Sequence, residues 1–260
     1  MPAGNLEAAL KRDRAFVIAG LGGIAGISWV YMFHLVREMG TSMGVDMGVP
    51  RMQGWGAVDF VLTFVMWAVM MVAMMIPSAA PMILTYSRVN RRHHEQRSPF
   101  LATGVFLAGY LVVWTAFSAV ATFAQWELNR AALLSPMMVS NSPLLGGMLL
   151  IGAGVFQFTP LKRACLAHCR SPLGFFMTEW REGTRGAFLM GIRHGAFCVG
   201  CCWLLMALLF VAGVMNLLWV AAIAAYVLVE KIVPAGHWVS LAIGLCIIGG
   251  GVWMVTGTLS

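Results

Sequence analysis

The sequence has little charge. Of its 260 residues only 10% are Asp, Glu, Lys or Arg, whereas soluble domains carry about 25%. Hydrophobic residues make up 60% of the chain and form long runs without the alternation of barrel strands. This composition leaves almost no material for a soluble domain. Because backbone polar groups in lipid must be satisfied within the protein, it predicts an all-α, polytopic transmembrane helical bundle, a single integral membrane domain over residues 1–260.

Several signatures of catalysis are also missing. The sequence has no P-loop and no C-x-x-C-H haem attachment motif. No Ser/His/Asp arrangement or pair of carboxylates stands out. These absences favour a protein that is not an enzyme.

The hydrophobic runs predict about seven spans, or six if the fifth and sixth merge. The predicted spans are Ala15–Val36, Val58–Ile76, Phe100–Phe123, Leu144–Phe158, Ala196–Val214, Leu217–Val229 and His237–Thr256. Joined as one helix, the fifth and sixth would exceed a hydrocarbon core of roughly 30 Å. Gly213, Met215 and Asn216 offer a turn between them.

The net charge of +7 is explained by the predicted loops, so nucleic acid is not an expected partner. One side of the map holds Lys11, Arg12, Arg14, Arg88, Arg91, Arg92, Arg97, Lys162, Arg163, Arg170, Arg181, Arg185, Arg193 and Lys231. The other side holds only Arg37, Arg51 and Arg130. This asymmetry predicts a cytoplasmic N-terminus. Glu230 and Lys231, at the end of the sixth span, are expected to be solvated flanking charges.

A stripe of metal-binding side chains opens the fifth span. His194, Cys198, Cys201 and Cys202 follow the spacing i, i+4, i+7 and i+8, which places them on one face of a helix. Thiolate and imidazole groups bind Cu(I), Zn²⁺ and similar metals. The alternative is that the thiols are small buried apolar side chains. Three cysteines and a histidine on one face favour a metal or redox role.

A second group lies in the predicted fourth loop, where Cys165 and Cys169 flank His168. These residue types are again ligands of soft or borderline metals, and the predicted topology puts them on the same side as the stripe.

Methionines form another pattern in the second span. Met70 and Met74 lie one turn apart, with Met71 and Met75 beside them. A thioether is a soft ligand that favours Cu(I), although methionine also fills irregular cores.

Pro77 and Pro81 lie where the second span is expected to end. They indicate either an ordinary helix terminus or a broken helix lining a site, since proline removes a backbone donor.

Four stretches carry a family resemblance. They are MMVAMMIPSAAPM (Met70–Met82), TPLKRACLAHCRSPLGF (Thr159–Phe175), GIRHGAFCVGCCWLLMALLF (Gly191–Phe210) and GVMNLLWV (Gly213–Val220). They resemble a bacterial family of predicted metal-binding integral membrane proteins, catalogued as a domain of unknown function. Some relatives are linked with copper supply to copper-dependent oxidases. The resemblance implies metal binding, with copper as the metal, and a multi-pass protein of the bacterial inner membrane.

Together these observations predict a Cu(I)-binding membrane protein, acting as a transporter or a membrane metallochaperone. Its expected partners are the lipid bilayer, the metal ion, and a copper-dependent oxidase or other membrane subunits. Zinc stays open as the metal. Two other functions stay open as well. Cys198-Val-Gly-Cys201 is a C-x-x-C pair, as in thiol–disulfide electron carriers. The chain could also be a non-catalytic subunit of a larger complex, with its sulfur residues only packing.

Overall fold

The structure is a computed structural model that describes residues 3–45, 55–93, 99–134, 142–233 and 236–257. In these residues the regular elements are all helices, which confirms the all-α prediction. They are α1 (Ala3–Val45), α2 (Ala57–His93), α3 (Pro99–Arg130), α4 (Pro143–Phe156), α5 (Pro160–Arg170), α6 (Pro172–Glu179), α7 (Gly183–Ala207), α8 (Leu209–Ala212), α9 (Leu217–Ile232) and α10 (Gly236–Thr256).

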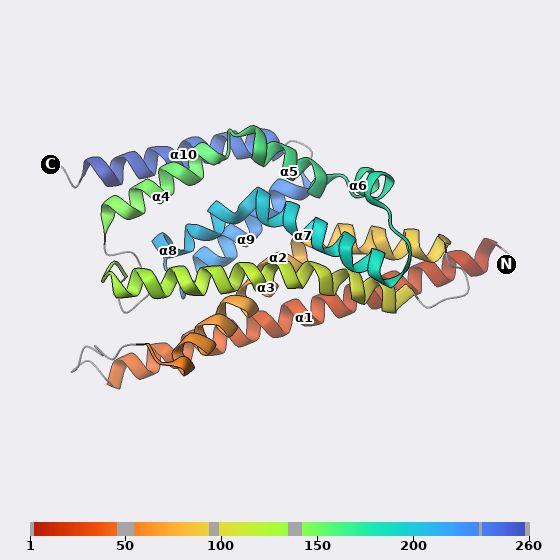
Figure 1. Ribbon diagram of the computed structural model, residues 1–260, viewed down its shortest axis with the longest axis horizontal. Coiled ribbons are helices and arrows are strands. Elements are labelled where there is room, and N and C mark those ends of the chain that lie inside the picture. The colour runs from red at the N-terminus through yellow and green to blue at the C-terminus, as the bar shows by residue number, and fades with distance from the viewer. Residues whose placement is uncertain (1–2, 46–54, 94–98, 135–141, 234–235, 258–260) are drawn as a thin grey trace.

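The helices form a bundle with a separate pair along one edge. Figure 1 shows α4 and α10 side by side at the top and α1 at the bottom, with α7, α9 and α3 between them. Helix α7 packs along α3 and under α5, while α9 contacts α2, α7 and α10. Side chains from α2, α3, α5, α7 and α9 can therefore meet inside the bundle.

Within the described parts of the chain, five helices are long and apolar enough to cross a membrane. They are Lys11–Glu38, Ala57–Arg91, Phe100–Arg130, Gly183–Ala212 and Trp238–Thr256. The pair α4 and α5, bent by 64° at Phe156–Pro160, adds a sixth if it counts as one broken span. Helix α9 has 16 residues and is shorter than a typical span of about 20. The total of seven spans and the cytoplasmic N-terminus stay predictions.

The turn predicted after the fifth span is confirmed. Gly213 has a φ of +94°, which L side chains rarely adopt, and it ends α8. The side-chain oxygen of Asn216 then accepts a hydrogen bond from the backbone N–H of Leu218 at 3.2 Å and caps α9. The chain thus reverses between α8 and α9.

The prediction that the second helical span ends near Ile76 is wrong. Helix α2 continues through Pro77 and Pro81 to His93. Nearby hydroxyl groups bond to backbone carbonyls in this stretch: the Ser78 hydroxyl donates to the Met75 carbonyl at 3.0 Å, and Thr85 donates to the Pro81 carbonyl at 2.8 Å. An interior proline costs a helix about 3 kcal/mol. Packing of α2 against α1, α3 and α9 offsets that cost.

The prediction of a fourth loop is also wrong, because these residues fold as α5, α6 and the first part of α7. The side chain of Thr159 accepts from the Lys162 backbone N–H at 3.3 Å, and Pro160 occupies the first turn of α5. Helix α7 starts at Gly183 rather than at Ala196. The cysteines predicted at the start of the fifth span therefore lie deep within a long helix.

Glycines allow two close contacts between helices. An added Cβ on Gly191 of α7 would meet the Phe106 carbonyl of α3, and one on Gly109 would meet the Phe188 carbonyl. In the edge pair, a Cβ on Gly154 of α4 would lie 2.8 Å from the Gly244 carbonyl of α10. Small residues allow such close backbone approach between apolar helices.

Candidate metal centre

The thiols of Cys198, Cys201 and Cys202 are fully buried in α7. The Sγ atoms of Cys201 and Cys202 lie 3.1 and 3.0 Å from the Cys198 backbone carbonyl. Cys169 of α5 joins them, since its thiol is within hydrogen-bonding reach of Cys198 and Cys201. We call these four residues the thiol cluster. The structure thus brings together the three cysteines of the predicted stripe and one cysteine of the predicted fourth loop.

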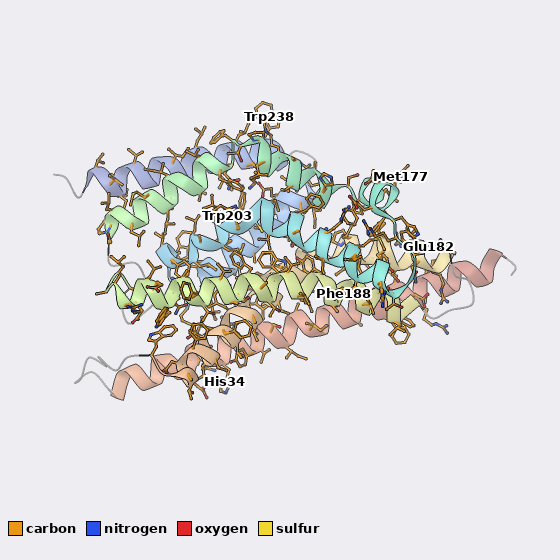
Figure 2. The ribbon with its side chains drawn as sticks, viewed as in Figure 1. His34, Met177, Glu182, Phe188, Trp203 and Trp238 are labelled. Atoms are coloured by element: carbon orange, nitrogen blue, oxygen red, sulfur yellow. The ribbon has the colours of Figure 1, made fainter. Side chains whose placement is uncertain are left out.

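The next residue of α7 marks the opposite face of the helix. Trp203 projects toward α4, where its ring meets that of Phe156 at 6.0 Å (Figure 2). Its ring is 43% exposed, whereas the thiols beside it are 0% exposed. The cysteines therefore occupy the interior side of α7, enclosed by other helices.

A lysine reaches the thiol cluster from α9. Lys231 Nζ lies 3.0 Å from Cys198 Sγ and 3.0 Å from Ser78 Oγ of α2, and the residue is only 6% exposed. The expectation of solvated charges at Glu230 and Lys231 is wrong, because α9 packs against other helices on both sides of its last turn. A buried ammonium costs free energy unless partners compensate for its lost hydration.

A tyrosine links the thiol cluster to α2. The Tyr110 hydroxyl of α3 donates to the Met75 carbonyl at 3.3 Å and lies 3.2 Å from Cys198 Sγ. Polar groups from α2, α3, α7 and α9 are thus linked to Cys198 by one or two hydrogen bonds.

The predicted methionines are all buried in the same core as the cysteines. Met70, Met71, Met74 and Met75 are at most 1% exposed. The contact that ties them to the thiol cluster is made by the Met75 backbone, through Tyr110. Four thioethers therefore share the buried interior with the thiols.

His194 lies one turn before Cys198 and is 1% exposed. Its ring stacks on Tyr110 at 5.4 Å and Phe106 at 6.2 Å, and meets Phe175 edge-on. Both ring nitrogens lack a hydrogen-bond partner. A buried imidazole without partners is costly, so it calls for an explanation that packing does not give.

The remaining predicted ligands lie outside the thiol cluster. A Cβ on Gly200 would be 2.9 Å from Cys165 Sγ, so Cys165 lies over α7 at a point of close approach. His168 stacks on Phe197 at 4.1 Å, with Nδ1 2.9 Å from the Ala164 carbonyl. His168 thus has its ring on Phe197 of α7 and its Nδ1 atom at the backbone of α5.

No group of three or more His, Cys, Asp and Glu side chains among the described residues is placed to hold one metal ion. The thiols of Cys201 and Cys202 both donate to the Cys198 backbone carbonyl, and this hydrogen-bonded arrangement is not that of metal ligands. Thiols gathered from two helices beside an unpartnered imidazole nevertheless match the donors of a soft-metal site.

Sequence reasoning missed Tyr110, Ser78 and Lys231. Tyr110 is a polar-tipped ring in the middle of a long apolar run, and Lys231 ends another. Ionisable groups in such positions are the signal that could have found them.

The fold and the site define a class: a polytopic helical protein with a buried, thiol-rich centre. The chain belongs to the PpoB2 family, described as copper chaperone, whose model matches residues 64–254. That family suggests a non-catalytic role and a copper-related function. Comparison with the curated proteins and with the solved structures gives no significant match.

Proposed function

We propose that this protein binds Cu(I) as its cargo at the thiol cluster and acts in copper transport or delivery at a bacterial inner membrane. The observation that carries the proposal is the burial of four cysteine thiols, from α5 and α7, within reach of one another. Cu(I) prefers soft thiolate and thioether ligands. Such a site, in a copper chaperone family, fits a carrier of Cu(I).

The charges around the thiol cluster favour Cu(I) over Zn²⁺. One Cu(I) ion held by two thiolates carries one negative charge, and the Lys231 ammonium beside Cys198 offsets it. Zn²⁺ held by the same two thiolates would be neutral, so the lysine would remain an uncompensated buried charge, and a zinc site would need a third thiolate to reach a charge of −1. Because isolated buried charges are expensive, Lys231 supports the monovalent ion at a site with two thiolates.

His194 and the methionines extend the same proposal. The two unpartnered nitrogens of His194 offer a further ligand one turn from Cys198. Met70, Met71, Met74 and Met75 supply thioethers in the core that continues from α2 to the thiols. A copper-dependent oxidase is the recipient that we propose for the delivered metal.

The first test removes the thiols. In the variant Cys198→Ser/Cys201→Ser/Cys202→Ser, we expect most Cu(I) retention to be lost in competition with a chromogenic chelator under anaerobic conditions. Cys169→Ser should weaken retention as well. Cys246→Ser is the control, since that cysteine is exposed on α10. If the triple variant keeps its copper, the thiols are only buried packing residues.

The second test separates copper binding from a thiol–disulfide carrier. The contact of Cys169 with Cys198 and Cys201 is the one observation that favours the carrier. Replacing Met70, Met71, Met74 and Met75 with Leu nearly conserves volume and usually costs under about 1.5 kcal/mol each. We expect folding to survive and Cu(I) affinity to fall. Unchanged copper affinity together with a reversible cysteine disulfide would favour the carrier.

A further inference from the structure

A second buried polar site lies on the other side of α9. The Glu230 carboxylate is fully buried and forms an ion pair with Lys162 Nζ at 2.7 Å. Its Oε1 atom also accepts hydrogen bonds from the Tyr226 hydroxyl at 3.1 Å and from the Ser240 hydroxyl. Lys162 donates in addition to the side-chain oxygen of Gln157. This network joins α4, α5, α9 and α10 around one neutralised pair.

A cavity of about 220 Å³ adjoins this pair, and its lining is basic. The lining residues are Gln157, Lys162, Arg163, Leu166, Ala167, Arg170 and Ser240. Glu230 neutralises Lys162, so Arg163 gives the cavity an excess of positive charge, and Arg170, which donates to the Val233 carbonyl at 2.7 Å, lines it as well. The amide nitrogen of Gln157, a residue only 2% exposed, has no acceptor. An excess of cations and a buried donor without an acceptor both call for an anion.

An apolar groove of about 510 Å³ lies along the same helices. Its walls include Leu150 of α4 together with Ile243 and Ile247 of α10. On α10 these two isoleucines lie three and seven residues after Ser240, and on α4 Gln157 lies seven residues after Leu150, so each helix presents one face to both spaces. The groove and the basic cavity therefore lie along one seam between the α4–α10 pair and α7–α9, and Tyr226 links them, since it lines the groove while its hydroxyl bonds to Glu230.

We propose that this seam binds an anionic phospholipid, with its phosphate group in the basic cavity and an acyl chain in the apolar groove. A basic recess on the same seam as an apolar groove matches the charge pattern of such a lipid, and basic pockets between membrane helices bind anionic headgroups. Trp238, 72% exposed, points away from the bundle near the start of α10, where α5 ends (Figure 2). Tryptophan is enriched at the membrane–water interface, where headgroups lie.

The test compares lipids on the purified full chain in detergent, after delipidation. Binding of phosphatidylglycerol and of phosphatidylcholine is measured by native mass spectrometry. We expect phosphatidylglycerol to bind about tenfold more tightly, as one charge-assisted hydrogen bond would give. Arg163→Gln should remove that preference. Arg185→Gln on α7, another exposed arginine, is the matched control and should keep it. Equal binding of the two lipids by the unmodified protein would overturn the proposal.

A second arm distinguishes a lipid from a free anion. Ala222 lines the apolar groove, so Ala222→Phe should narrow it and weaken phosphatidylglycerol binding several-fold. Inorganic phosphate should bind weakly to the unmodified protein and be indifferent to this change. Phosphate that binds as tightly as the lipid, together with lipid binding unaffected by Ala222→Phe, would contradict the lipid assignment. Neither arm involves copper, so the result is independent of the proposed function.

Discussion

Two neighbouring residues in the last turn of α9 are both buried but face different surroundings. Glu230 turns toward α5 and α10, where Lys162 neutralises it and hydroxyl groups surround it. Lys231 turns toward α2 and α7, where its partners are a hydroxyl and a thiol. Among the described residues, no carboxylate lies within ion-pair distance of Lys231. One charge is thus balanced by a partner in the fold, and the other is not.

The difference separates a structural pair from a functional charge. A buried ion pair whose partners neutralise each other holds helices in register and leaves no net charge to balance. An ammonium beside Cys198 keeps an unmatched positive charge until anionic sulfur is present. We therefore assign Lys162–Glu230 to the architecture and Lys231 to the cargo site, and each assignment can be broken by one substitution.

The largest expected effect is on stability, from Lys162→Met. This change leaves the Glu230 carboxylate buried without its cation, and breaking such a pair costs about 3–5 kcal/mol. We expect a loss of that order in the free energy of unfolding, measured by denaturing-detergent titration in mixed micelles. Cu(I) affinity of the folded fraction should stay the same.

The double variant Lys162→Met/Glu230→Gln is the control for this prediction. Removing both charges should restore much of the lost stability, because no unpaired charge is left behind. A double variant as unstable as the single one would show that Lys162 stabilises through packing and not through charge.

The next effect is on metal affinity, from Lys231→Met. This change removes the cation at 3.0 Å from Cys198, and a hydrogen bond to a charged group contributes about 1.5–3 kcal/mol. We expect Cu(I) affinity to fall by roughly tenfold or more. Zn²⁺ affinity should stay equal or rise, so the Cu(I)/Zn²⁺ ratio measured by chelator competition is the sharper readout.

The ratio also guards against a trivial outcome. A variant that merely folds poorly would lose both metals together. Parallel loss of Cu(I) and Zn²⁺ binding would therefore contradict the charge assignment, while a fall in the ratio alone would support it.

The sequence predicted the class of fold but not its breaks. Long apolar runs predicted helices, and Gly213 with Asn216 predicted a turn that the structure contains. Pro77 and Pro81 wrongly indicated that the helix ends there. Helix α2 continues through both prolines, where neighbouring helices pack against it and local hydroxyl groups bond to its carbonyls. Residues 159–193 looked like a loop because they are rich in charge, although Thr159–Pro160 is a helix-start signal.

The candidate site was predictable where it depends on spacing along one helix. The period of α7 alone places Cys198, Cys201 and Cys202 together. Contacts between helices were beyond reach, since nothing in one sequence says that Lys231 approaches Cys198 from 33 positions away. The same limit applies to the adjacent residues His168 and Cys169. The sequence could not show that Cys169 belongs to the thiol cluster and that His168 lies outside it.

The smallest expected effect comes from His168, which lies outside the thiol cluster, and it is compared with that of His194, which lies one turn from Cys198. His168→Ala removes a ring that stacks on Phe197, and such a pair contributes about 0.5–1.5 kcal/mol to stability. Cu(I) affinity should be unchanged, because the imidazole is occupied outside the thiol cluster.

His194→Phe keeps an aromatic ring of similar shape among Tyr110, Phe106 and Phe175 but removes both unpartnered nitrogens. It should hold or raise stability, since no buried polar group is left unpaired. If His194 is a ligand, this variant loses Cu(I) affinity while His168→Ala does not. Equal affinity in both variants would remove His194 from the cargo site and leave the cysteines as its ligands.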